Sequence, residues 1–228
     1  MQPHTVQAAL RGKVKSVDET TYVQNADGTR GAMDHRLLTN YDERGCSLGG
    51  ERFDNRGRSV AKFVTTYDKN GDFVQSEGLS PDGQVAWMQT VTFDVVAKTV
   101  TSPGGHVPRS SVSYYDAQGR LKEVRNFDAD GTTLVNRMTT TYDPSGKQVL
   151  VVIYGKGDQK LVTTQRVLNP DGSVALEQIV QANGTVVHIL DEYPTHDEHG
   201  NWTSRHEKSD ATDGSANGTV TERIITYY

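Results

Sequence analysis

Hydrophobic and polar positions alternate along most of this chain with a period of two, which predicts β-strands. Residues 132–141 show the pattern clearly, because the run is rich in Thr and Val and contains neither a helix cap nor a helical stripe of apolar residues. Residues 148–154 differ in being apolar at nearly every position. We expect this strand to be covered on both faces, either by a sheet that curls over itself or by a neighbouring element.

A short motif separates the predicted strands: an aromatic residue followed by Asp-x-x-Gly. The Asp side chain of such a turn accepts a hydrogen bond from a backbone N–H two residues on, and the Gly takes the left-handed conformation at no steric cost. This combination commonly closes a β-hairpin. The turn-defining pairs are Asp42 and Gly45, Asp54 and Gly57, Asp68 and Gly71, Asp116 and Gly119, Asp128 and Gly131, and Asp143 and Gly146.

Turn glycines recur in alternating steps of 12 and about 14 residues, so the repeat is a hairpin of about 26 residues. We predict an all-β fold: a long, twisted antiparallel meander of tandem β-hairpins in an open or partly rolled sheet, forming a single domain over residues 1–228. Residues 1–12 should be flexible, and residues 197–228 should cap the repeat array. Residues 94–110 are either an irregular hairpin, which we favour because the register resumes at Tyr115, or a break between two halves.

Composition narrows the classes of function. Only 34% of the 228 residues are hydrophobic and the mean hydropathy is −0.62, which suits long sheets with much exposed face. The net charge is −5 and no basic cluster is present, so nucleic acid and anionic membrane surfaces are poor partners. No apolar run approaches the roughly 20 residues that span a bilayer. Cys46 is the single cysteine, which excludes an intrachain disulfide and a cysteine-based metal site.

The repeated motif, together with an opening segment at 12–17 and closing segments at 197–203 and 225–227, resembles the Tyr-Asp (RHS) repeat proteins of bacteria. The resemblance covers nearly the whole chain and is strongest to short, stand-alone members found in bacterial envelopes. It implies an exported repeat protein and transfers no catalytic residues. Long members of the family form β shells around a toxin cargo, but this chain lacks the autoprotease and cargo segments expected of them.

The sequence offers two candidate metal sites. Imidazole and carboxylate groups brought to one side of a turn could hold zinc, and the candidates are His196, His199 and His206, with Asp197 and Glu198 alongside. The alternative is that these are ordinary exposed polar residues of a turn. The sequence after Asp128 resembles the start of a calcium loop, but position twelve should be Glu and is Thr139, so an EF-hand is excluded. Weak calcium binding at stacked turn carboxylates stays open, and we expect no cofactor.

The sequence lacks the residue patterns expected of an enzyme. The sequence contains no Gly-x-Ser-x-Gly elbow, and nearly every Asp is assigned to a turn. Aromatic platforms on a flat sheet suit sugar rings or extended peptides, and the speculative ligand-binding residues are Trp87, Trp202, Tyr115 and Tyr142. The competing interpretation is that strand-end aromatics close hairpins and that Trp87 belongs to the core.

Taken together, these features predict a non-enzymatic repeat protein of the bacterial cell envelope that binds or scaffolds a polysaccharide or an envelope protein. The alternatives are a toxin-associated or chaperone-like component and, less favoured, an envelope glycan hydrolase. We expect a periplasmic, outer-membrane-associated or secreted location, and no signal sequence is visible in the chain as given. The expected assembly is a monomer or weak oligomer without a transmembrane segment.

Overall fold

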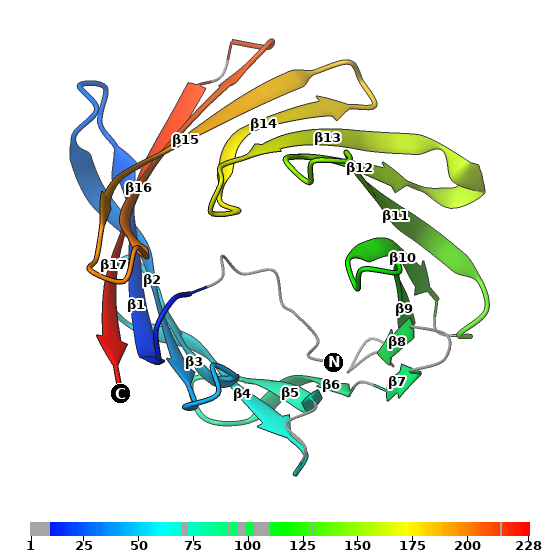
Figure 1. Ribbon diagram of the computed structural model, residues 1–228, viewed down its shortest axis with the longest axis horizontal. Coiled ribbons are helices and arrows are strands. Elements are labelled where there is room, and N and C mark those ends of the chain that lie inside the picture. Colours follow the sequence, from blue (N-terminus) through cyan, green and yellow to red (C-terminus); the bar gives the residue numbers. More distant parts are fainter. Residues whose placement is uncertain are drawn as a thin grey trace. The chain divides into compact units, whose positions relative to one another are not determined.

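A computed structural model describes residues 10–69, 73–90, 92–94, 99–102, 110–128, 130–214 and 216–228. These residues form seventeen strands (Figure 1). The strands are β1 (Val14–Gln24), β2 (Arg30–Tyr41), β3 (Ser47–Phe53), β4 (Ser59–Tyr67), β5 (Phe73–Leu79), β6 (Val85–Thr90), β7 (Thr92–Asp94), β8 (Thr99–Ser102), β9 (Ser110–Tyr115), β10 (Leu121–Phe127), β11 (Leu134–Tyr142), β12 (Gln148–Tyr154), β13 (Lys160–Leu168), β14 (Val174–Gln181), β15 (Val186–His196), β16 (Trp202–Ala211) and β17 (Ala216–Tyr227).

Strands that follow one another in the sequence pair in antiparallel fashion, as from β2 to β5 and from β7 to β14. The first and last strands also pair, with Glu19 opposite Arg223 and Thr21 opposite Thr221. In the described residues the helical content is one three-residue 3-10 turn, η1 (Lys156–Asp158). The predicted all-β antiparallel meander is therefore confirmed.

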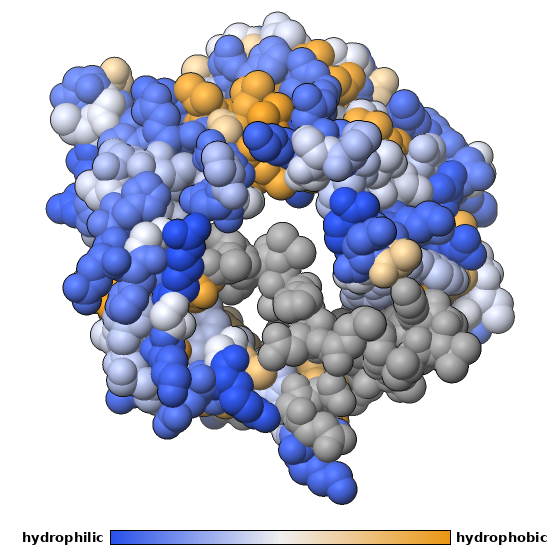
Figure 2. All heavy atoms as spheres, in the orientation of Figure 1, coloured by the Kyte–Doolittle hydropathy of each residue, from blue (hydrophilic) through white to orange (hydrophobic). Residues whose placement is uncertain are grey.

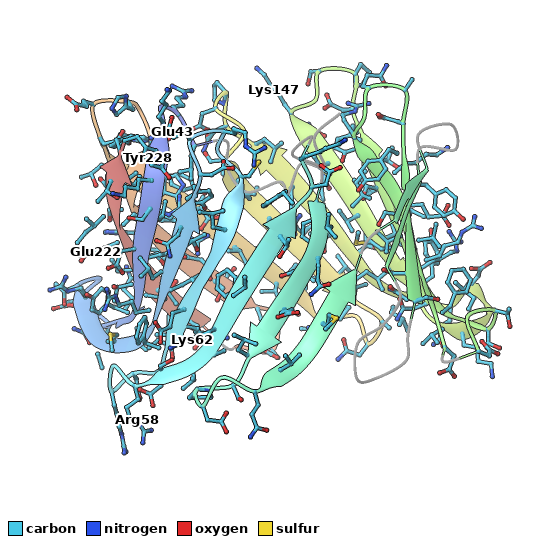
Figure 3. The ribbon with its side chains drawn as sticks, turned by 90° about the horizontal axis from the view of Figure 1, so that it is seen from below. Glu43, Arg58, Lys62, Lys147, Glu222 and Tyr228 are labelled. Carbon is cyan, nitrogen blue, oxygen red and sulfur yellow. The ribbon has the colours of Figure 1, made fainter. Side chains whose placement is uncertain are left out.

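The turns have the predicted geometry. At the turn between β2 and β3, the backbone N–H of Gly45 donates to the carbonyl of Asp42 (2.9 Å), and Gly45 has a φ of +83°. One carboxylate oxygen of Asp42 accepts from the backbone N–H groups of Arg44 (3.0 Å) and Cys46 (2.9 Å). The motif thus satisfies three backbone donors locally. Charged residues such as Glu43, Arg58 and Lys147 lie at the turn tips (Figure 3).

One turn contains a further carboxylate that accepts backbone hydrogen bonds. Between β10 and β11, the side chain of Asp130 accepts from the backbone of Thr132 and Thr133 (2.8 Å each). Asp128 contributes its backbone, receiving the N–H of Gly131 (2.9 Å). At the turn after β4, Asp68 is described but Gly71 lies outside the described residues.

The chain divides into two compact units. Unit 1 comprises residues 1–87, 190–209 and 216–228, and unit 2 comprises residues 88–189 and 210–215. The boundaries fall inside β6 and β15 and near the end of β16. Each unit is described by itself, and the single domain over residues 1–228 stays a prediction. Of the interruption at 94–110, residues 95–98 and 103–109 lie outside the described part, while β8 pairs with both β7 and β9.

Few side chains are fully buried, as the low hydrophobic content indicates. A small core in unit 1 consists of Val14, Val17 and Tyr41, with Leu10, Ile225 and Tyr227 packed against it. The visible face in the space-filling view is mostly hydrophilic, with smaller groups of apolar residues (Figure 2). Strand β12 buries Val149 on one face and Val152 on the other, whereas Leu150 is 40% exposed. The expected coverage of both faces of this strand is therefore partial.

Candidate functional site

Trp202 is buried, with 8% of its surface exposed, although the sequence suggested it as a ligand platform. The Tyr193 ring packs against it, with centroids 5.6 Å apart. The Arg223 guanidinium covers the indole at 3.3 Å from the ring centroid. Because both neighbours belong to the sheet itself, Trp202 is a packing residue of unit 1 in this structure. Sequence inspection alone could not find this, since the covering residues come from β15 and β17.

An ion pair between β17 and β1 holds Arg223 in place. Its Nε donates to Glu19 at 2.7 Å, and the two residues are directly opposite each other in the register. Burial lowers the pKa of the Arg223 guanidinium, while the Glu19 carboxylate counteracts the shift. Arg205 lies beside this pair, 3.3 Å from Glu207 and 3.9 Å from Asp191. The charges of this cluster are therefore matched within the sheet.

The closing motif of the chain is a structural junction. Buried Asn201 donates to the backbone carbonyl of Arg11 (2.8 Å) and to the hydroxyl of Tyr227 (2.8 Å), and its Oδ1 accepts from the N–H of Arg11 (2.6 Å). The Tyr227 hydroxyl in turn donates to Asp197. Residues 197–228 therefore bind the segment before β1 as well as ending the chain. Leu10 and Arg11, expected to be flexible, are held by these contacts, and residues 1–9 lie outside the described part.

The three histidines do not form a metal site. His199 stacks on Tyr227 with centroids 4.2 Å apart, and His196 and His199 are exposed. Across the described residues, no group of three His, Cys, Asp or Glu side chains is placed to hold a metal ion. Cys46 is half-buried, and burial raises the pKa of its thiol.

Among the other predicted platform residues, Tyr142 is half-buried and its hydroxyl donates to the carbonyl of Leu121 (3.0 Å). The Arg120 guanidinium covers its ring at 4.3 Å. Tyr115 is also half-buried, and burial raises the pKa of its hydroxyl. The side chain of Trp87 lies outside the described part of the chain. The Tyr142 ring thus carries a guanidinium group from its own sheet.

A cationic side chain over an aromatic ring is a recurring arrangement in both units. The pairs in unit 1, other than those on Trp202, are Arg30 over Tyr22, Arg36 over Phe53, and Lys15 over Tyr228. The pairs in unit 2 are Arg120 over Tyr142, Arg125 over Tyr114, and Arg137 over Tyr154. A guanidinium stacked on a ring keeps its N–H edge available for planar acceptors.

Two of these pairs meet on one face of unit 2. Arg125 on β10 lies directly opposite Arg137 on β11, and Arg137 lies opposite Tyr154 on β12. The guanidinium of Arg137 is 4.0 Å from the Tyr154 ring, and that of Arg125 is 4.8 Å from the ring of Tyr114 on β9. Tyr114 lies opposite Glu123 and is therefore a diagonal neighbour of Arg125 on the same face. Tyr114, Arg125, Arg137 and Tyr154 form a row across four consecutive strands, which we call the Tyr–Arg row. Strands are spaced ~4.8 Å apart, so the row spans roughly 14 Å.

One carboxylate accompanies each arginine of the row. Arg125 donates through Nε to Glu123 (2.8 Å), and Arg137 donates through Nε to Asp158 (2.7 Å). These hydrogen bonds raise the pKa of both guanidinium groups. Asp158 lies in η1 with a φ of +60°, a conformation that side chains other than Gly adopt at a cost. Arg125 is 43% exposed and Arg137 24% exposed, so the row reaches solvent mainly at Arg125 and only partly at Arg137.

The sequence contains a signal for this row that residue types alone do not give. Arg125 and Arg137 each lie six residues from Gly131, and in a hairpin the residues equally distant from the turn face each other. Tyr154 faces Arg137 for the same reason, across the next turn.

No protein-family model and no curated protein matches the sequence. Among solved structures, the chain is similar to a porin-like protein from Bacteroides uniformis ATCC 8492, with a TM-score of 0.62 and 11% sequence identity. That match covers 95% of this chain and 98% of the other, and it shows a common fold. A structure of TcdB2-TccC3-TEV matches with a TM-score of 0.24 and 10% identity, covering 86% of this chain and 16% of that one.

No helix in the described part of the chain has the length and apolarity needed to cross a bilayer.

Proposed function

We propose that this chain is a non-enzymatic binding module of the bacterial cell envelope, and that it holds a polysaccharide against the Tyr–Arg row of unit 2. The observation that carries the proposal is the row itself: two aromatic rings and two guanidinium groups fixed by strand register on one sheet face. The resemblance of the turn motifs to Tyr-Asp (RHS) repeat proteins of bacterial envelopes supports the location.

The row is suited to an extended ligand. Backbone pairing sets the spacing of its four side chains, so binding costs little of their conformational freedom. Ring stacking and carboxylate hydrogen bonds further restrict both arginines. A chain lying across the strands would meet one ring or guanidinium group at each strand.

The turn carboxylates support a role in binding over one in hydrolysis. A general acid requires a raised pKa. Hydrogen bonds from Arg58 lower the pKa of Asp54 to about 2, and those from Thr133 lower that of Asp130 to about 2. These groups are ionised at neutral pH and occupied as acceptors in their own turns.

A ligand panel tests the proposal. The purified chain would be heated with envelope polysaccharides, peptidoglycan fragments and envelope proteins, and each hit titrated by calorimetry. A ligand at about 100 times its dissociation constant stabilises the folded state by about 2.7 kcal/mol, and each kcal/mol raises Tm by roughly 2–4 °C at this chain length. We expect a polysaccharide to give such a shift. Stabilisation by a protein alone, or by nothing in the panel, would overturn the proposal.

A further inference from the structure

We infer that Arg125 and Arg137 together bind the carboxylate group of an acidic, uronate-type polysaccharide, and that Asp158 occupies Arg137 until the ligand arrives. The inference rests on the proposed function and names the ligand class for the same row. Its starting point is the direct opposition of two arginines on neighbouring strands.

Like charges directly opposite each other destabilise a β-sheet. The nearby asparagines of the same strands show the alternative, because Asn126 donates to Asn136 across the pair at 2.6 Å and no charge is involved. Each arginine of the pair is accompanied by a carboxylate, Glu123 at Arg125 and Asp158 at Arg137. An anion bound between the two guanidinium groups would offset the repulsion expected between like charges. Binding of an anion would therefore explain why two arginines lie opposite each other.

The geometry favours a planar carboxylate. A guanidinium presents a rigid, planar fork of N–H groups that matches two carboxylate oxygens. Among the described residues, the Arg137 guanidinium makes one hydrogen bond, through Nε to Asp158, so its terminal nitrogen atoms have no partner there. Arg125 is bound to Glu123 through Nε and, at 3.3 Å, through one terminal nitrogen. Donors of both arginines therefore remain for a ligand, and the rings of Tyr114 and Tyr154 flank it.

Asp158 has the properties of a replaceable counter-ion. Its side chain is 67% exposed, so its ion pair with Arg137 contributes little to stability. Glu123, with 18% exposure, is the more firmly held partner of the pair. A ligand carboxylate can replace Asp158 with no loss of charge balance at Arg137.

Calorimetry with polygalacturonate and with its methyl ester tests this ligand class, because the two polymers share a backbone and differ in charge. We expect polygalacturonate to bind at least ten times more tightly than the ester. Equal binding of both would overturn the carboxylate site while leaving polysaccharide binding intact. Absence of binding to both would overturn the carboxylate site as well. The proposed function would then be tested by the panel of polysaccharides, peptidoglycan fragments and envelope proteins. Dextran sulfate, compared with dextran, separates a carboxylate site from one for any polyanion; equal or tighter binding of dextran sulfate would overturn the carboxylate assignment.

Three variants assign the residues. Arg137→Gln should weaken polygalacturonate binding at least tenfold, whereas Arg30→Gln should change it less than twofold. Arg30 is the matched control, since it also stacks on a tyrosine and pairs with a carboxylate but faces Gln24 instead of a second arginine. Asp158→Asn should tighten binding severalfold by freeing Arg137. Unchanged binding in folded Arg137→Gln, or weaker binding in Asp158→Asn, would contradict the inference.

Discussion

The side-chain amide of Asn201 makes two hydrogen bonds to the backbone of Arg11: it accepts from the N–H at 2.6 Å and donates to the carbonyl at 2.8 Å. The two residues are 190 positions apart in the chain. A third hydrogen bond, from Asn201 to the Tyr227 hydroxyl, adds the last strand to the same junction. The buried amide of Asn201 thus joins the segment before β1 to both the β15–β16 turn and β17.

Asn201→Ala should lower the free energy of unfolding by about 2–3 kcal/mol, because it removes the hydrogen bonds of a buried amide to the backbone of Arg11 and to the Tyr227 hydroxyl. Urea denaturation followed by tryptophan fluorescence measures the change. Asn183→Ala is the control, since Asn183 is exposed and accepts one turn hydrogen bond from Thr185; it should cost less than about 1 kcal/mol. Equal effects of the two variants would contradict the role of the junction.

Gly50 is required by the close approach of two neighbouring strands. A Cβ at this position would lie 1.9 Å from the carbonyl oxygen of Leu38 and 2.7 Å from the Phe63 ring. Gly50→Ala should therefore destabilise the chain by at least about 2 kcal/mol, as overpacking does. Gly57→Ala should cost about 1 kcal/mol, because Gly57 has a φ of +74° but nothing lies within 4 Å of its Cβ position. A smaller loss for Gly50→Ala in urea denaturation would contradict this packing.

Two arginine–carboxylate ion pairs have the same N–O distance of 2.7 Å but differ in burial. Their coupling energies therefore test the effect of burial on an ion pair. Arg223 and Glu19 are 17% and 25% exposed, whereas Arg30 and Glu222 are 51% and 44% exposed. Double-mutant cycles with Arg→Met and Glu→Gln should give a coupling of roughly 0.2–1 kcal/mol for the exposed pair and more than about 1 kcal/mol for the half-buried one. Equal coupling energies would contradict a contribution from burial, since both arginines also stack on an aromatic ring.

The turn at Asp54 predicts a pH dependence of stability. Hydrogen bonds from the Arg58 backbone and side chain lower the pKa of Asp54 from 3.8 to about 2 in the folded state. The ionised carboxylate therefore stabilises the fold above pH 3.8, and this contribution disappears as the pH falls from 3.8 to about 2. Asp54→Asn should be less stable than the parent chain at pH 5–7, and the difference should shrink towards pH 2. A difference that does not vary with pH would contradict this assignment.

The turns and the meander were predictable because their signals are local. Asp42 and Gly45 interact within one turn, so five consecutive residues specify the geometry. The environment of Trp202 was not predictable, because Arg223 and Tyr193 reach it from other strands. The hydrogen bonds that the Asp130 side chain accepts from Thr132 and Thr133 were not predicted, because the Asp-x-x-Gly motif indicates only the first Asp of the turn.

The arginine pair lies between these extremes. The sequence shows that Arg125 and Arg137 are equally distant from Gly131. Their direct opposition can be inferred only once the hairpin register is known. The contact of Asp158 with Arg137 joins residues 21 positions apart, and no residue pattern indicated it. Local chemistry thus predicted the scaffold, whereas the candidate site required the pairing of strands.

The central claim is that ligand binds on the Tyr–Arg row, and NMR of the full chain tests it most directly. Amide and arginine Nε–Hε resonances would be followed as polygalacturonate is added. The account predicts that the largest shifts occur at Arg125 and Arg137 and at the backbone of β9 to β12, with the Arg30 side chain unchanged. Shifts centred on the Trp202 cluster of unit 1, or shifts at neither arginine, would contradict it.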